Sequence, residues 1–240
     1  MYLFRTSHGP ADLAFTDRFG GVSASPYDEL NLALESDDDP EAVAENWRRL
    51  MADFAPEARM LADMHQVHGT VVQTVEDWPA TPWGPACDGV VSVSTGTVLA
   101  VRVADCVPVL LVDEASGVIG AAHAGRRGLL SGVVRATLSR MRELGAQQIA
   151  AWIGPHVCGG CYEVPAGMQE DVAAAVPESR ATTTWGTPSI DLGAGVRAQL
   201  EAEDVMVNDV SRCTRESDDL YSHRRDGDRA GRLAGLVVLR

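Results

Sequence analysis

Two short runs of apolar residues stand out near the middle of the chain. They cover positions 107–112 and 118–122 and consist mainly of aliphatic side chains. The five residues between them, 113–117, are of types that favour turns. Short apolar runs divided by such a turn predict a β-hairpin. The centre of the chain is therefore expected to form a two-stranded ladder.

The predicted hairpin brings a thiol and an imidazole together at its open end. With the turn centred on Ala115, Val107 faces His123 and Cys106 faces Ala124. The Cβ atoms of Cys106 and His123 are then about 5–8 Å apart. The pair could share a metal ion or act as nucleophile and base, although either residue alone is more often part of a core. Together, beside a glycine-rich turn, they favour a functional site.

A helical pattern follows the hairpin directly. Apolar residues recur at three- and four-residue spacing through 129–144, and Gly145 is placed to cap the helix. The stretch 123–128 is then a strand-to-helix turn, whose free backbone N–H groups favour a phosphate or a carboxylate. Arg126 and Arg127 add positive charge there, unless their side chains are simply solvated. We therefore expect an anion pocket beside the cysteine and histidine.

Short strands and helices alternate through the rest of the chain. Helices are predicted at 40–54, where Pro40 begins the first turn, and at 165–176 and 193–203. Strands are predicted at 13–16, 70–75, 90–94, 97–103, 149–153, 189–192, 205–210 and 236–239. No repeat, low-complexity tract or linker divides the sequence. A single domain, residues 1–240, of mixed α and β elements is expected.

The composition limits the classes of partner. The chain has 240 residues with a formal net charge of −14, and all 20 of its basic residues are arginine. This charge argues against nucleic-acid polymers and anionic membranes as partners, and the absence of lysine excludes Schiff-base and P-loop chemistry. No run approaches transmembrane length, and no apolar segment follows a basic start. We expect a cytoplasmic protein that is a monomer.

Further candidate residues lie before the hairpin. His65 and His68 precede a predicted strand, where their side chains are free to converge on a metal ion. Trp78 and Trp83 lie in a long connection and could stack on a flat base or anchor the surface. Arg18, before a pair of glycines, could hold an anion or lie exposed in a loop.

Other candidates lie after the hairpin. Cys158 and Cys161 form a C-x-x-C motif next to His156, which could hold a structural zinc ion or act as a redox pair. The five cysteines are odd in number and scattered, which does not indicate a disulfide framework. Four arginines within 224–232 could form internal ion pairs or contact a substrate.

Several short motifs occur in the order of one known family. They are T-D-R-F-G-G-V-S at 16–23, N-L at 31–32, Q-V-H-G at 66–69, A-D-C at 104–106, H-A-G at 123–125, I-G-P at 153–155, Y-E-V at 162–164, C-T at 213–214, Y-S at 221–222 and R-R-D at 224–226. In these motifs, which span nearly the whole chain, the sequence resembles the YfiH/laccase-domain family. Its members are also called multicopper polyphenol oxidase-like or peptidoglycan editing factor proteins.

The resemblance implies both a fold and a metal site. The implied fold is of the α+β class, with mixed sheets in an α/β/β/α layered single domain related to the cytotoxic necrotizing factor-like cysteine hydrolases. The implied metal ligands, which are also the expected catalytic residues, are His68, Cys106 and His123. The hairpin pattern independently pairs the last two. Three residues are expected to bind substrate: Arg18, Asn31 and Arg127.

Two positions depart from the family pattern. Arg126 stands where the family usually has a tryptophan after H-A-G, which predicts a changed pocket wall. His223 stands before the first tail arginine, at a position that is often aromatic. Both departures leave the expected ligands in place, so they bear on substrate preference.

The names of the family imply three activities. The first is zinc-dependent phosphorolysis of purine nucleosides such as adenosine and inosine to base and ribose 1-phosphate, with adenosine deamination at the same site. It fits best, because two nitrogens and one thiolate leave a fourth zinc position open. Copper could occupy the same ligands, but polyphenol oxidation by a trinuclear cluster needs H-x-H pairs, and the six histidines form none. A metal- or cysteine-dependent amidase acting on peptidoglycan precursors through Cys106 is the third activity.

Overall fold

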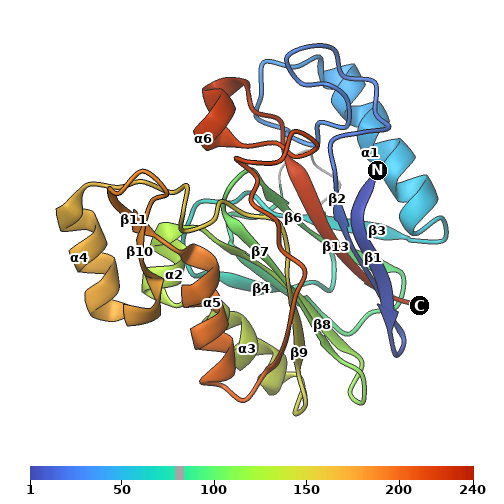
Figure 1. The fold of residues 1–240 in the computed structure, drawn as a ribbon. Helices are drawn as coiled ribbons and strands as arrows, with labels where there is room; N and C mark the ends of the chain where they lie inside the picture. The colour runs from blue at the N-terminus through green and yellow to red at the C-terminus, as the bar shows by residue number, and fades with distance from the viewer. Residues whose placement is uncertain (79–83) are drawn as a thin grey trace.

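Two β-sheets stacked face to face form the centre of the computed structural model, which describes residues 1–78 and 84–240 (Figure 1). Helices cover the outer face of each sheet, so the described chain is layered in the order α/β/β/α. The expected α+β class with mixed sheets in layers is confirmed.

The first sheet has five strands in the order β1-β2-β13-β6-β3. Their bounds are Tyr2–His8 (β1), Ala11–Thr16 (β2), Leu233–Leu239 (β13), Thr97–Val103 (β6) and Met60–Asp63 (β3). Strand β13 lies antiparallel between β2 and β6, whereas β3 pairs with β6 in parallel. The end of the chain therefore lies in the middle of the sheet.

The second sheet has six strands in the order β12-β9-β7-β8-β5-β4. Their bounds are Met206–Asp209 (β12), Ala150–Ile153 (β9), Val107–Asp113 (β7), Val118–Ala124 (β8), Gly89–Ser92 (β5) and Val72–Thr74 (β4). A separate antiparallel pair joins β10 (Arg180–Thr182) and β11 (Pro188–Ile190). Strand β8 pairs antiparallel with both β5 and β7, so its end lies beside the starts of those two strands.

The central strands are buried on both faces, because each lies between the other sheet and a layer of helices. In β7, Leu110 and Val112 pack between the two sheets. Val109 and Leu111, on the opposite face, pack against the helices. This double burial explains why the hairpin strands read as continuous apolar runs rather than alternating ones.

Among the described residues, one helix covers the outer face of the five-stranded sheet. Helix α1 (Pro40–Phe54) begins at the predicted proline, and the Asp39 carboxylate accepts a hydrogen bond from the Glu41 N–H at 2.9 Å. Trp47 and Leu50 bury its apolar face against the sheet. The predicted helix is confirmed.

The remaining helices follow the hairpin in sequence. Helices α2 (Arg126–Ser131), α3 (Val133–Glu143), α4 (Ala166–Ala175) and α5 (Leu192–Glu201) contribute to the core on the outer side of the six-stranded sheet. The short helix α6 (His223–Asp226) lies apart from them, near the loops that connect β2 to α1 (Figure 1). No helix within residues 1–78 and 84–240 is both long and apolar enough to cross a membrane.

The central hairpin forms, but its register differs from the prediction by one residue. Val107 pairs with Ala124, and Pro108 pairs with His123. The predicted pairing of Val107 with His123 is therefore wrong. Cys106 precedes the first paired residue, so it still lies at the same edge of the sheet as His123.

The reason for this register lies in the turn. Asp113 pairs with Val118, which leaves a turn of four residues instead of five. The Asp113 carboxylate accepts hydrogen bonds from the N–H groups of Ala115 and Ser116, both at 3.0 Å. Gly117 closes the turn with a φ of 63°, a value that glycine adopts without strain. These bonds favour the shorter turn.

The predicted helix 129–144 is divided in two. Helix α2 already begins at Arg126, and Gly132 separates it from α3 with a φ of 86°. An apolar pattern does not reveal this break, because both helices bury their apolar faces against the same sheet. Gly145 does lie just past the end of α3, with a φ of 103°, as predicted. The sequence pattern missed β1, β3, β10 and α6.

Candidate functional site

The three residues expected to hold a metal ion lie together at one end of the six-stranded sheet. His68 lies between β3 and β4, Cys106 lies just before β7, and His123 lies near the end of β8. Their potential ligand atoms all lie within 4.8 Å of one another. The Cys106 Sγ is 3.8 Å from His68 Nε2, and the two imidazole rings are 4.8 Å apart between centroids.

Close packing against a glycine fixes this cluster. A Cβ atom at Gly125 would lie 2.6 Å from the Cδ2 atom of His68 and 3.0 Å from the Cys106 Sγ. Any larger residue would push both side chains away, so the glycine of the H-A-G motif is required by space. His68 adopts a φ of 59°, a left-handed conformation that is uncommon for residues with a side chain.

Asp88, which no pattern in the sequence marks, connects the two histidines. Its fully buried carboxylate is 2.8 Å from the Nδ1 atom of His123. The same carboxylate accepts hydrogen bonds from the N–H groups of Val67, His68 and Gly69 at 2.6–3.2 Å. With Nδ1 directed at Asp88, His123 has Nε2 left for a metal ion. Metal-binding histidines are commonly oriented by a carboxylate in this way.

The protonation of the cluster follows from these contacts. Burial raises the pKa of the Cys106 thiol, but the neighbouring charges and hydrogen bonds of His123 and His68 lower that pKa to about 6. Burial lowers the pKa of His123, whereas the Cys106 thiolate and Asp88 raise it to about 9. Burial also raises the pKa of Asp88, but the bonds from His123 and Gly69 lower it overall. Near neutral pH the thiolate, the form that binds metals, is therefore favoured.

Asp105, the residue before Cys106, is held in place by hydrogen bonds from other parts of the chain. Asp105 has a φ of 95°, and its carboxylate accepts hydrogen bonds from the Thr214 hydroxyl at 2.6 Å and the Arg224 N–H at 2.5 Å. Its carbonyl accepts the N–H of Val157 at 3.0 Å. Three segments that are distant in sequence thus hold the turn that presents Cys106.

A cavity of about 270 Å³ opens in front of the cluster. It lies where the end of β6 and the start of β13, from the first sheet, meet the hairpin of the second. Besides the three candidate ligands it is lined by Glu35, Gln66, Arg102, Val103, Ala104, His223 and Arg232. A concave site of this size with a few charged groups is suited to a small molecule.

Two arginines line the cavity, and they differ in their partners. Arg102 is buried and pairs with the Asp63 carboxylate, with Nε 2.9 Å from Oδ1. The side chain of Arg232 instead donates to the carbonyls of Ala230 and Gly231 at 2.8 and 3.1 Å. Burial lowers the pKa of Arg232, although the guanidinium stays charged at neutral pH. Its charge is therefore available to an anion in the cavity.

Gln66 of the Q-V-H-G motif has a structural role. Its side-chain amide donates to the Arg102 carbonyl and accepts the Arg102 N–H, both at 2.8 Å. This pair of bonds fastens the loop that carries His68 to strand β6. The glutamine thereby fixes the wall of the cavity.

The residues expected to bind substrate are placed differently. Asn31 is buried and accepts hydrogen bonds from the N–H groups of Ala33 and Arg232 at 2.9 and 3.0 Å. It therefore positions the loop of a cavity arginine. Arg18 stacks over the Tyr221 ring at 4.7 Å and donates to the Asp28 carbonyl, and it is not among the residues that line the cavity.

The arginines after the hairpin also lie apart from the cavity. Arg126 is partly buried at the start of α2 and Arg127 is exposed, and neither lines the cavity. Positive charge comes to the cavity from Arg102 and Arg232 instead. Of the two tryptophans, Trp78 packs on the core and donates to the Asp63 carbonyl at 3.2 Å. Trp83 lies outside the described residues.

The donor set fits a zinc ion. Two imidazoles and one thiolate, with the second nitrogen of one imidazole held by a buried carboxylate, are typical of three-ligand zinc sites that keep a fourth position for a substrate. The cavity adjoins these ligands directly.

A family model described as "Multi-copper polyphenol oxidoreductase laccase" matches residues 12–240. The chain belongs to this family. Its curated relatives carry a different name. A purine nucleoside phosphorylase of Streptomyces griseus is 50% identical over 239 residues, covering 96% of this chain and 95% of that protein. A protein of the same name from Deinococcus radiodurans is 42% identical, covering 94% of this chain and 88% of its own length.

Solved structures show the same fold. The hypothetical protein YfiH of Bacillus licheniformis superposes with a TM-score of 0.88 at 25% identity, covering 96% of this chain and 93% of that one. YlmD of Geobacillus stearothermophilus superposes with a TM-score of 0.82 at 29% identity over the full length of both chains. The resemblance seen in the sequence motifs is confirmed, and the family assignment supports an enzyme.

The carboxylate behind His123 should control metal affinity. We expect Asp88→Asn to weaken zinc binding about 10–100-fold, because the amide lacks the charge that orients and polarises the imidazole. Competition with a chromophoric chelator measures this affinity, and circular dichroism checks the fold. Asp113→Asn is the matched control, since Asp113 is also buried but binds the hairpin turn. Equal zinc affinity in Asp88→Asn and wild type would contradict the assigned role.

Proposed function

We propose that the protein is a zinc-dependent purine nucleoside phosphorylase that also deaminates adenosine. It would convert adenosine, inosine and related nucleosides plus phosphate to the free base and ribose 1-phosphate. The names of the relatives support the reaction class. The observation that carries the proposal is the cavity in which His68, Cys106 and His123 meet Arg232, a cation whose side chain pairs with backbone carbonyls.

The proposed ligands are His68 Nε2, the Cys106 thiolate and His123 Nε2. A zinc ion held there would act as a Lewis acid, polarising a substrate group at its open fourth position. Asp88 would hold a His123 proton on Nδ1, so that Nε2 is the nitrogen that binds the ion once its own proton is released. The anchored turn at Asp105 and the close contact with Gly125 hold the ligands in place.

Phosphorolysis needs an anion beside the sugar. In the proposed reaction a phosphate oxygen bonds to C1′ of the ribose, the bond from C1′ to the purine nitrogen breaks, and its electron pair leaves with the base, which takes up a proton. Arg232 would hold the phosphate, because its partly buried guanidinium lines the cavity and can form charge-assisted hydrogen bonds with an anion. Deamination at the same site would use water in place of phosphate and release ammonia from the purine.

A second candidate is a cysteine-dependent amidase acting on peptidoglycan precursors. The arrangement of Cys106, His123 and Asp88 favours it, because a thiol, an imidazole and a carboxylate in series form the usual nucleophile, base and orienting group of cysteine hydrolases. His68, which lies 3.8 Å from the same sulfur, favours three-point metal coordination instead.

Removal of single ligands separates the two candidates. We expect Cys106→Ala, His68→Ala and His123→Ala each to lose the zinc ion of this site and the activity together, because two remaining ligands hold zinc weakly. Elemental analysis of the purified variants and nucleoside turnover measure the two effects. Chelation of the wild type should abolish turnover, and zinc should restore it. Full activity in protein shown to be free of metal would support the cysteine nucleophile.

Phosphate dependence should differ between the two proposed reactions. We expect release of hypoxanthine from inosine to require phosphate and conversion of adenosine to inosine to proceed without it, because only the first reaction uses phosphate as the nucleophile. Chromatography of products, with phosphate removed enzymatically from the assay, measures both. Ribose instead of ribose 1-phosphate as the sugar product, at an unchanged rate, would indicate hydrolysis.

The location of the phosphate can be tested with three arginines. We expect Arg232→Gln to raise the KM for phosphate roughly 10–100-fold, the effect of losing a hydrogen bond between charged groups. Arg135→Gln, on the exposed face of α3, is the control and should leave this KM unchanged. An increase in Arg127→Gln, with Arg232→Gln unaffected, would move the phosphate to the start of α2.

A further inference from the structure

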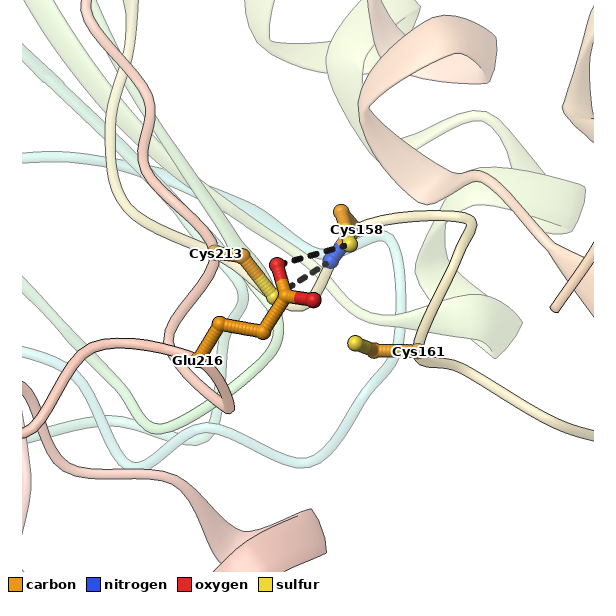
Figure 2. A group of neighbouring side chains, drawn as sticks. All are labelled: Cys158, Cys161, Cys213 and Glu216. Carbon is orange, nitrogen blue, oxygen red and sulfur yellow. Dashed lines mark hydrogen bonds between the residues drawn. The ribbon is translucent and has the colours of Figure 1, made fainter. Parts of the chain in front are cut away.

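Three cysteines and a glutamate form a second cluster, separate from the candidate active site. Their potential ligand atoms lie within 4.8 Å of one another, and Figure 2 shows the side chains of Cys158, Cys161, Cys213 and Glu216 directed toward one another. Cys158 Sγ is 3.9 Å from a carboxylate oxygen of Glu216. Cys161 is buried, the other two cysteines are partly buried, and Glu216 is exposed. None of the four lines the cavity described above.

The backbone around the cluster is built as a tight turn facing a second segment. The N–H groups of Cys161 and Tyr162 both donate to the Cys158 carbonyl, at 3.0 and 3.1 Å. The N–H of Cys158 lies 3.5 Å from the Cys213 Sγ. A C-x-x-C turn that faces a third cysteine is typical of structural zinc sites. His156, considered from the sequence as a ligand, is directed elsewhere, with Nδ1 2.9 Å from the Gly154 carbonyl and Nε2 against Gly193.

We propose that Cys158, Cys161, Cys213 and Glu216 bind a structural zinc ion that joins the loop after β9 to the segment before α6. Four protein ligands close the coordination sphere, as structural sites require, whereas the site at Cys106 has three. In a tetrahedral site, sulfur atoms lie about 3.8 Å apart and sulfur and oxygen about 3.5 Å. Because the ligand atoms lie within 4.8 Å of one another, each separation needs to close by at most about 1.3 Å. On binding, the three thiols release their protons to solvent.

A redox pair is the other use of a C-x-x-C motif. Reactive cysteines have a lowered thiol pKa, but burial and the neighbouring Cys213 raise the pKa of Cys158. A disulfide needs only two cysteines, whereas here a third cysteine and a carboxylate also lie within 4.8 Å. These features favour the metal.

The proposed ion would help to hold the turn that presents Cys106 in the candidate active site. Residues on both joined segments contact Asp105, whose neighbour is Cys106. Val157 donates to its carbonyl, and Thr214 donates to its carboxylate. The two segments also pair directly, because the His156 N–H donates to the Arg212 carbonyl and the Thr214 N–H to the His156 carbonyl. Fixing the cysteines therefore fixes the turn that presents Cys106.

Zinc stoichiometry tests the proposal without any nucleoside, so its failure is distinct from failure of the proposed function. Untagged protein is kept reduced and anaerobic, incubated with zinc, freed of loosely bound metal by gel filtration and analysed for zinc per chain. We expect two ions in the wild type and one in each of two variants, Cys161→Ser and His123→Ala. The double variant should hold none. Cys87→Ala, which removes the remaining cysteine from the core between the sheets, is the control and should hold two.

A second measurement applies if Cys161→Ser folds poorly. His123→Ala, with its thiolate cluster intact, is loaded with cobalt, and we expect the intense sulfur-to-cobalt charge-transfer bands of a tetrahedral site with several thiolates. Zinc should also raise the melting temperature of His123→Ala, because an ion that binds only the folded state stabilises it. Three results would each overturn the proposal: one ion in the wild type and none in His123→Ala, no charge-transfer bands, or a disulfide among these cysteines in freshly prepared protein.

Discussion

A buried negative charge organises the candidate active site. The Asp88 carboxylate is fully buried, and such a charge is tolerated only where hydrogen bonds replace its lost water. Here the replacements are three consecutive N–H groups of the loop at 67–69 and the imidazole of His123. The same requirement that keeps Asp88 ionised therefore fixes the backbone of His68 and the orientation of His123. Two candidate ligands, one in the loop at 67–69 and one on strand β8, are positioned by one carboxylate.

The layered fold determines where this charge can act. Asp88 ends the connection before β5, His123 lies near the end of β8, and the antiparallel pairing of these strands brings both to one edge of the sheet. The five-stranded sheet contributes Arg102 from near the end of β6, and Arg232 lies directly before β13. Because the two sheets stack face to face, ligands and cations from opposite layers reach the same cavity. Either sheet alone would provide only the candidate ligands or only the arginines.

The sequence predicts the local elements better than the contacts between them. Apolar runs and the proline at position 40 locate most strands and helices, and the hairpin pattern pairs Cys106 with His123 in spite of a register that is wrong by one residue. Asp88 could not be found in this way, because its partners lie about 20 and 35 residues away and no periodicity links them. Arg232 is a similar case, since only the central position of β13 brings it to the cavity. Local patterns in the sequence predict helices and strands, whereas the pairing of distant strands brings the residues of the candidate site together.

The arginines show that closeness in sequence to the candidate ligands does not place a cation in the cavity. Arg126 and Arg127 directly follow the hairpin in sequence, which predicts an anion site beside them, but they lie at the start of α2 and do not line the cavity. Arg232 reaches it because Asn31 accepts its backbone N–H at 3.0 Å, and the Leu32 N–H donates to its carbonyl. The asparagine of the N-L motif thus acts on the cavity through the backbone of a residue 201 positions away. Position in the cavity, rather than proximity in sequence to the cysteine and histidine, determines which cation can meet an anionic substrate.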